Sequence, residues 1–231
     1  DEGMAAPIED YAMLSDCRAA ALVSREGSID WLCLPRFDSP SLFGALLGDE
    51  RHGRWRLRPT DPEATATRAY EGDCFVLHTR WTTATGVAEV IEFMPHDEHT
   101  DIVRRIRGVE GHVEFEVELR VRPDYARSMP WMRQVGTDDE PALVAIAGPD
   151  ASVVRGVRLH ADGVAHRGTV TVTPAHTTDL TLTWFPSHHS APPACDADAA
   201  LAHTTSWWHN WAAGIDHDGP IVSQSDRVDL Y

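Results

Sequence analysis

The stretch HVEFEVELRVRP, residues 112–123, alternates apolar and charged side chains along its whole length. One face would carry the apolar residues and the other the charged ones: Val113, Phe115, Val117, Leu119 and Val121 against Glu114, Glu116, Glu118, Arg120 and Arg122. A period of two is typical of an antiparallel strand with one face in the core and one in water. Because the alternation explains the three glutamates as a solvated strand face, we do not interpret them as paired catalytic carboxylates.

Similar patterns surround this strand from residue 52 to residue 186. Segments such as HGRWRLRP (52–59), GVAEVIEFMP (86–95) and DLTLTWFPS (179–187) alternate or run apolar between Gly, Pro, Asp and Thr breaks. Roughly a dozen such strands with short connections predict an all-β chain folded as a large antiparallel two-layer sandwich, because a second sheet buries both inner faces.

The N-terminal part predicts a β-hairpin over residues 17–35, in which two apolar runs flank Arg25-Glu26-Gly27-Ser28. Gly27 supplies the positive φ that a tight turn requires. Asp38-Ser39-Pro40 then combines a capping side chain with a proline in the first turn, which is a helix-start signal. A short helix is therefore predicted after the hairpin, ending at Gly48. Its apolar residues at helical spacing are Leu42, Phe43, Leu46 and Leu47.

The composition changes after Ser190. A Pro-rich link leads into DADAALAHTTSWWHNWAAG, residues 196–214, which predicts an amphipathic helix ended by Gly214. Its apolar stripe holds Ala200, Trp207, Trp208 and Trp211. Because this is too much apolar surface for a free helix, we expect it to pack on the sandwich or on a further domain. We divide the chain into a sandwich domain, residues 1–190, and a link, helix and tail, residues 191–231.

Charge and composition exclude several classes of function. Twenty basic against 36 acidic side chains give a net charge of −16, which argues against nucleic-acid binding and against docking on anionic membranes. The four cysteines are widely spaced, so neither a disulfide framework nor metal ligation is expected. We see no long apolar run and no signal peptide, and we expect a cytoplasmic protein.

No known catalytic or cofactor pattern appears among these residues. The histidines form no H-x-H or H-E-x-x-H pattern, and there is no G-x-S-x-G elbow, P-loop or dinucleotide fingerprint. We therefore expect no metal and no cofactor.

Two aromatic clusters remain as candidates for function. One has Trp31 and Phe37 around Arg36 and Asp38; the other lies in RPDYARSMPW, residues 122–131, and contains Asp124, Tyr125, Arg127 and Trp131. Aromatic faces beside Arg and carboxylate groups suit a neutral sugar. They equally suit a packed corner of a sandwich, and the residues alone favour that second interpretation.

A longer block carries a resemblance to a known family. IEDYAMLSDCRAAALVSREGSIDWLCLPRFDSPSLFGALL, residues 8–47, resembles the start of bacterial proteins of glycoside hydrolase family 15, the glucoamylase-like and trehalase-like enzymes. The resemblance is to their N-terminal trehalase-like domain, and it continues through GVAEVIEFMP to SWWHNW, residues 206–211.

The resemblance implies a β supersandwich, a helical linker and then an (α/α)6 barrel that holds two carboxylates for inverting hydrolysis of α-glucosidic bonds. It places that barrel after this chain, so no catalytic residue is assigned here and the isolated domain is expected to be inactive. The implied partners are the catalytic barrel of the same polypeptide and its α-glucoside substrate, with neither nucleic acid nor membrane, and a homo-oligomer is a further option.

Within that layout we expect one group of residues to face the mouth of the barrel and to line or buttress its sugar site: Trp31, Arg36, Phe37 and Asp38. A second group is expected to pack between domains: Asp124, Tyr125, Arg127, Trp131, Trp207, Trp208 and Trp211. Two alternatives from other classes stay open, an autonomous carbohydrate-binding module and a structural or oligomerisation domain.

Overall fold

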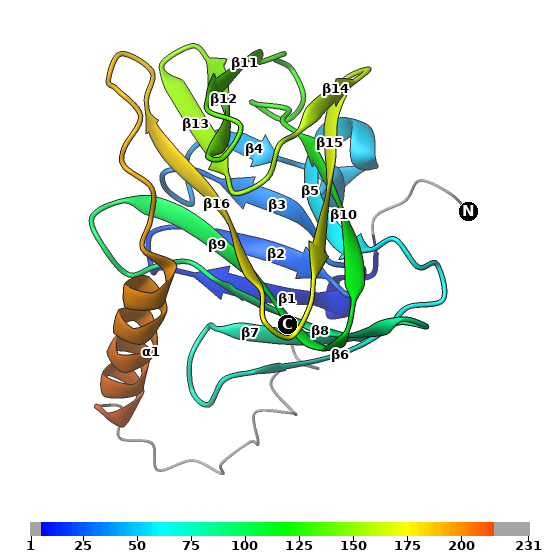
Figure 1. The fold of residues 1–231 in the computed structure, drawn as a ribbon. Helices are drawn as coiled ribbons and strands as arrows, with labels where there is room; N and C mark the ends of the chain where they lie inside the picture. The colour runs from blue at the N-terminus through cyan, green and yellow to red at the C-terminus, as the bar shows by residue number, and fades with distance from the viewer. Residues whose placement is uncertain (1–5, 215–231) are drawn as a thin grey trace.

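Two eight-stranded antiparallel sheets lie face to face in the computed structural model, which describes residues 6–214 (Figure 1). Sheet A has the order β1-β2-β3-β5-β10-β15-β14 with β4 paired to β3, and sheet B has the order β11-β12-β13-β16-β9-β8-β7-β6. The strands of sheet A are β1 (Tyr11–Ser15), β2 (Ala20–Ser24), β3 (Ser28–Cys33), β4 (Ser41–Phe43), β5 (Arg54–Pro59), β10 (Val113–Arg120), β14 (His160–Asp162) and β15 (Ala165–Val172). Those of sheet B are β6 (Thr65–Tyr70), β7 (Leu77–Thr82), β8 (Gly86–Phe93), β9 (Thr100–Gly111), β11 (Trp131–Gly136), β12 (Pro141–Ala147), β13 (Asp150–Arg155) and β16 (Thr177–Pro186).

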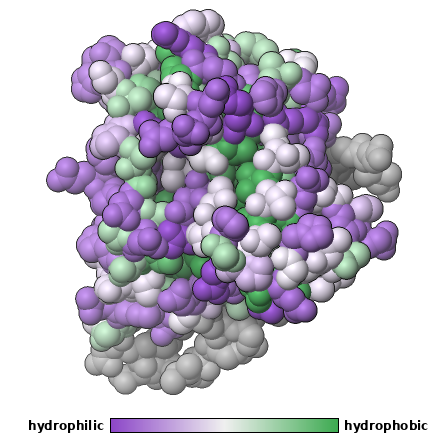
Figure 2. All heavy atoms as spheres, in the orientation of Figure 1, coloured by the Kyte–Doolittle hydropathy of each residue, from purple (hydrophilic) through white to green (hydrophobic). Residues whose placement is uncertain are grey.

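The alternating stretch forms β10, which pairs with β5 on one side and β15 on the other. Its apolar side chains are fully buried and join residues of both sheets in one continuous core. The prediction of an antiparallel two-layer sandwich is therefore confirmed, with more strands than the sequence suggested. The outer surface is mostly hydrophilic on the face drawn in Figure 2, with hydrophobic residues in small clusters.

The first hairpin is also confirmed. β2 and β3 are joined by a turn in which Gly27 has φ +73°, and a Cβ added at Gly27 would lie 2.2 Å from the carbonyl oxygen of Leu57. Both the turn and the close approach of β5 therefore require glycine at this position.

The helix predicted from Asp38-Ser39-Pro40 is wrong. The chain forms β4 instead, and two single 3-10 turns follow it at Ala45–Leu47 and Glu50–His52. A third 3-10 turn, Ile8–Asp10, lies before β1. Phe43 and Ser41 pair with Leu32 and Cys33 of β3, so sheet pairing overrides the local helix signal.

Arg104 of β9 ties the two sheets together inside the core. Its guanidinium is fully buried and donates to Glu92 of sheet B at 2.7 Å, and to the carbonyl oxygens of Trp55 at 2.8 Å and Gly27 at 2.6 Å in sheet A. It also lies 5.0 Å from the centroid of the Trp55 ring, within cation–π range.

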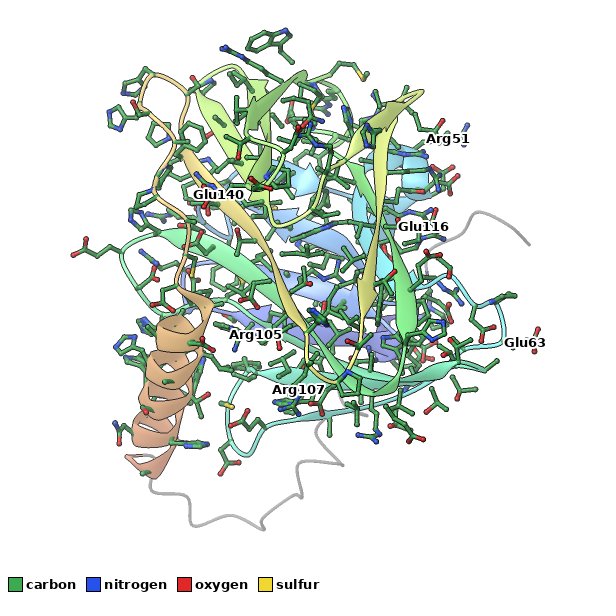
Figure 3. The ribbon with its side chains drawn as sticks, in the orientation of Figure 1. Arg51, Glu63, Arg105, Arg107, Glu116 and Glu140 are labelled. Carbon is green, nitrogen blue, oxygen red and sulfur yellow. The ribbon has the colours of Figure 1, made fainter. Side chains whose placement is uncertain are left out.

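The C-terminal helix is confirmed as α1 (Ala197–Ala213), with Asp196 as its N-cap and Gly214 following. It packs on part of the outer face of sheet B, where Trp208 lies with Ile91, Phe93 and Val103 of β8 and β9. Arg105 of β9 reaches from the sheet toward the helix (Figure 3) and pairs with Asp198 in its first turn at 2.5 Å. Within residues 6–214, no helix combines the length and the apolar character needed to cross a membrane.

Candidate functional site

The connection between β3 and β4 presents its central side chains to solvent. Its backbone is held by the Phe37 N–H, which donates to the Arg18 carbonyl at 2.9 Å, and by the Arg36 N–H, which donates to the Ser39 hydroxyl at 3.1 Å. The Phe37 side chain is 58% exposed, and Arg36 and Asp38 pair with each other at 2.9 Å while both stay largely in water. The bond from Arg36 holds the pKa of Asp38 below its usual value.

The connection between β10 and β11 contains three consecutive left-handed residues. Asp124, Tyr125 and Ala126 have φ of 53°, 55° and 64°, a conformation that costs a non-glycine residue roughly 1–2 kcal/mol. The turn is closed by the Arg127 N–H, which donates to the Asp124 carbonyl at 3.0 Å. Such strain persists only where surrounding contacts hold it.

Ser41 supplies the contacts that join this turn to the first loop. Its carbonyl oxygen accepts from the Asp124 N–H and its hydroxyl from the Tyr125 N–H, both at 2.9 Å. The Tyr125 ring then meets Trp31, with centroids 6.1 Å apart and planes inclined by 46°. A small cavity of about 40 Å³ lies between these two segments and sheet B, lined by Pro40, Pro123 and Pro130 together with Asp150 and Trp184.

The structure joins the two predicted clusters at the Trp31–Tyr125 ring pair and through Ser41, whereas Trp131 lies apart. Trp131 opens β11, is 60% exposed and is paired in register with Ile146, without a ring contact to Trp31 or Tyr125. We define the corner surface as the remaining set: Trp31, Arg36, Phe37, Asp38, Asp124, Tyr125 and Arg127.

Several polar groups of the corner surface have no partner in the part of the chain that the structure describes. The Asp124 carboxylate, the Tyr125 hydroxyl and the Arg127 guanidinium make no hydrogen bond or ion pair there. Elsewhere in the same residues most guanidinium groups are paired, as in Arg25 with Asp10 and Arg51 with Asp49. Free polar groups beside exposed rings are typical of a binding surface rather than of a closed corner.

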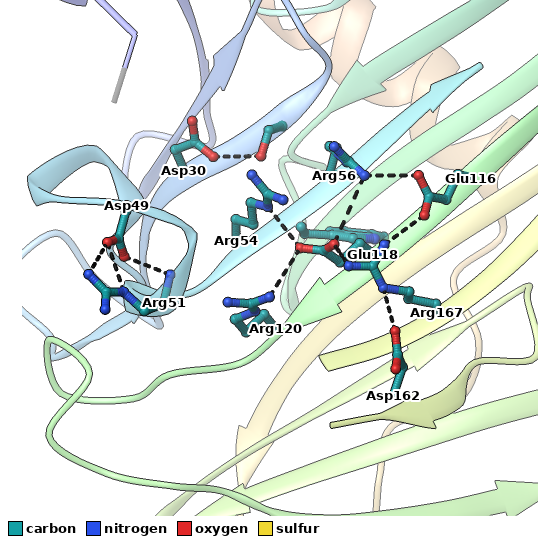
Figure 4. Close-up of polar contacts among 12 residues, drawn as sticks. Asp30, Asp49, Arg51, Arg54, Arg56, Glu116, Glu118, Arg120, Asp162 and Arg167 are labelled. Carbon is teal, nitrogen blue, oxygen red and sulfur yellow. Dashed lines mark hydrogen bonds and ion pairs between the residues drawn. The ribbon is translucent and has the colours of Figure 1, made fainter. Parts of the chain in front are cut away.

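The outer face of sheet A carries a dense ionic network (Figure 4). Glu118 is fully buried there and accepts from Arg54 at 2.8 Å and pairs with Arg167 at 2.5 Å. Burial alone would raise the pKa of Glu118, but the bond from Arg54 and the charges of Arg54, Arg167 and Arg56 hold it below its usual value. The expectation of a purely solvated glutamate face is therefore wrong for Glu118, because arginines of β5 and β15 cover it.

Asp30 is the described carboxyl whose position most invites an acid–base interpretation. Burial raises the pKa of Asp30, although bonds from Ser28 and Tyr11 act in the opposite direction. Both carboxylate oxygens are occupied, by the Ser28 hydroxyl at 2.5 Å and the Tyr11 hydroxyl at 2.7 Å. Asp30 therefore ties β1 to β3 across β2, and each of its oxygens already accepts a hydrogen bond within the fold.

The helix tryptophans divide between inside and outside. Trp208 is buried and stacks edge-on against Phe75, with centroids 4.8 Å apart. Trp207 lies against the His96 ring at 3.6 Å, and Trp211 rests on Trp208 with half of its surface exposed. Trp211 is the helix tryptophan with most surface left for a further domain.

No group of three or more His, Cys, Asp or Glu side chains among residues 6–214 is arranged to hold a metal ion. All four cysteines are free thiols; Cys33 and Cys74 are buried, Cys195 is partly buried and Cys17 is exposed.

The sequence did not point to Ser41 or to the left-handed turn. The turn contains no glycine, and Asp124 alone belongs to a residue type that tolerates this conformation well. Pro123-Asp124 was the available turn signal.

Comparison with known proteins gives consistent matches. The family model described as "Trehalase-like, N-terminal" matches residues 2–202. A trehalase of Mycolicibacterium smegmatis is 32% identical over 232 residues, which cover 89% of this chain and 34% of that protein. A trehalase of Mycobacterium tuberculosis is 30% identical over 231 residues, with the same coverage of both chains. Trehalase 1 of Sulfolobus acidocaldarius is 41% identical over 117 residues, which cover 50% of this chain and 19% of that protein. The chain spans about a third of the length of the first two.

Proposed function

This chain belongs to the family of trehalase-like N-terminal domains, and from that premise we propose that it is the non-catalytic N-terminal domain of a longer glycoside hydrolase. The observation that carries the proposal is the coverage: 89% of this chain matches only 34% of a trehalase. The substrate of the whole protein is an α-glucoside, with trehalose as the first candidate. The reaction is inverting hydrolysis of the family 15 type.

Inverting hydrolysis requires two carboxyl groups about 6.5–9.5 Å apart, with a water held between them. Two buried acids of the described residues have other roles. Glu118 is held ionised by arginines, and Asp30 is bonded through both oxygens. These occupied carboxyls support a catalytic centre in the polypeptide that follows this domain.

The corner surface is the proposed contact with that following domain. Arg36, Phe37 and Asp38 extend into water from a loop whose backbone is fixed by other residues, so the local fold does not require these side chains. We propose that they, with Trp31, face the catalytic domain and line or buttress its sugar site. Trp131 and Trp211 remain proposed packing residues between the domains, as do Asp124, Tyr125 and Arg127.

The activity assay is glucose release from trehalose, maltose and soluble starch by the isolated chain and by the full-length protein. The isolated chain is expected to release none, and the full-length protein is expected to act on trehalose. Specific release by the isolated chain would overturn the non-catalytic assignment, and a full-length protein inactive on every α-glucoside would overturn the hydrolase assignment.

The surface assay uses matched variants of the full-length protein. Arg36→Ala and Phe37→Ala are expected to lower turnover while leaving the melting temperature unchanged. Arg51→Ala and Leu47→Ala are the controls, since Arg51 forms a similar exposed pair with Asp49 and the Leu47 side chain is 64% exposed. Wild-type turnover per folded molecule in the first two variants would make the loop structural.

The domain boundary at residue 190, the homo-oligomer and the cytoplasmic location remain predictions. Light scattering of the full-length protein tests whether it forms a homo-oligomer.

A further inference from the structure

Two aromatic rings from distant parts of the chain form one pair on the corner surface. Trp31 comes from β3 and Tyr125 from the connection between β10 and β11, and their planes are inclined by 46°. Tyr125 is 44% exposed, so a large part of the residue stays accessible. In the described part of the chain, neither the Tyr125 hydroxyl nor the Trp31 indole N–H makes a hydrogen bond.

The pair is held rigidly at both ends. Trp31 lies two residues before Cys33, and Cys33 is paired in register with Ser41. Ser41 is 1% exposed and accepts the N–H groups of Asp124 and Tyr125 through its carbonyl and hydroxyl oxygens. The β3–β4 pairing therefore places the backbone at both rings, and the bonds to Ser41 hold the left-handed turn in its strained conformation.

The free polar groups beside the pair sum to zero charge. Asp124 contributes a carboxylate and Arg127 a guanidinium, and neither has a partner among residues 6–214. Within a chain of net charge −16, these two free charges balance each other and favour neither a cation nor an anion. Open ring faces with free donors and acceptors suit a neutral polyhydroxylated ring, which offers apolar faces for stacking and hydroxyls for hydrogen bonds.

We propose that Tyr125 and Trp31 contact a glucosyl unit of the substrate, and that Ser41 is the positioning residue that holds Tyr125 in place. This inference rests on the proposed function, because the glucosyl unit is delivered by the catalytic domain. It goes further by assigning the contact to Tyr125, which lies outside the loop of residues 34–40. The alternative occupant of the pair is an apolar side chain of the catalytic domain itself.

The test is steady-state hydrolysis of trehalose by the full-length protein and its variants. Tyr125→Ala is expected to raise KM about tenfold with kcat within about threefold, since a factor of ten corresponds to about 1.4 kcal/mol of lost binding. Ser41→Ala is expected to raise KM in the same direction but less, and Ser41→Thr, which keeps the hydroxyl, to restore it. Leu47→Ala is the control for loss of an exposed apolar side chain.

The outcomes separate the two proposals. A wild-type protein that hydrolyses no α-glucoside would overturn the proposed function itself. A hydrolysing wild-type protein with unchanged KM in Tyr125→Ala would overturn the sugar contact alone. Equal losses of melting temperature and kcat in Tyr125→Ala and Ser41→Ala, with KM unchanged, would assign the pair to domain packing.

Discussion

Replacing Arg104 by methionine tests the link between the two sheets most severely. The substitution keeps a long apolar side chain but removes the charge and three hydrogen bonds. It leaves the buried carboxylate of Glu92 without its ion-pair partner, and the carbonyl groups of Trp55 and Gly27 each lose one hydrogen bond, although Gly27 still accepts from the Leu57 N–H. No water can replace these donors unless the core opens, because the Arg104 side chain is fully buried.

The expected cost follows from these contacts. Removing one partner of a buried ion pair costs about 3–5 kcal/mol. The hydrogen bond that each carbonyl loses adds about 0.5–1.5 kcal/mol, although the terms overlap. We therefore expect Arg104→Met to lower the free energy of unfolding by about 4 kcal/mol or more, a large part of the ~5–15 kcal/mol typical of a domain.

Equilibrium urea unfolding of the chain, followed by tryptophan fluorescence and circular dichroism, measures this loss. The double variant Arg104→Met with Glu92→Met is expected to recover part of it, since no unpaired carboxylate remains. Arg51→Met is the matched control, because the Arg51 side chain is largely exposed, and no measurable change is expected there. A loss below about 1 kcal/mol in Arg104→Met, or no recovery in the double variant, would refute the reasoning.

Three further predictions concern the outer surfaces of the sandwich. Glu118→Gln is expected to make the free energy of unfolding fall less steeply as the pH is lowered. The pKa of Glu118 is lower in the folded chain than the ~4.3 of an unfolded glutamate, so its ionised form stabilises the fold above that pH. This stability is lost as the pH falls through the folded pKa, and the variant has none of it to lose. Urea midpoints between pH 7 and pH 3 measure it, and an unchanged slope would contradict the role of the network. Trp208→Ala removes the anchor of α1, and we expect a loss of about 3–5 kcal/mol together with faster hydrogen exchange in that helix, whereas unchanged exchange would show that other contacts hold it. Ala126→Gly relieves a left-handed residue at φ 64°, so urea unfolding is expected to show no loss of stability, and a loss above about 1 kcal/mol would argue against strain at this turn.

The layers of the fold could be predicted because they follow from local periodicity. The alternation in residues 112–123 specifies a half-buried strand, and Gly27 specifies the hairpin turn, since both signals are read within a few residues. The helix at 197–213 likewise carries its own cap at Asp196 and its own apolar stripe.

The errors have non-local causes. The helix signal at Asp38-Ser39-Pro40 lost to pairing of Ser41 and Phe43 with β3, a contact that no local window contains. Glu118 is buried by Arg54 and Arg167, which lie far from it in the sequence but close in space because β5 and β15 flank β10. Alternation predicts which side chains share a face, but it does not reveal whether their neighbours cover them.

The candidate site was predictable as two clusters and not as one surface. The half-buried Trp31 and the exposed Arg36, Phe37 and Asp38 were found because the hairpin did not require them. Their connection to Tyr125 depends on Ser41 and on a left-handed turn without glycine, for which the sequence carries little signal.

Hydrogen–deuterium exchange tests the central claim most directly, by comparing the isolated chain with the same residues in the full-length protein. If this domain docks through the corner surface, peptides covering residues 31–41 and 122–131 gain protection in the full-length protein, while peptides of β6 at the far edge of sheet B stay unchanged. Equal exchange of the corner peptides in both forms would contradict the account, and protection confined to β6 would place the contact elsewhere.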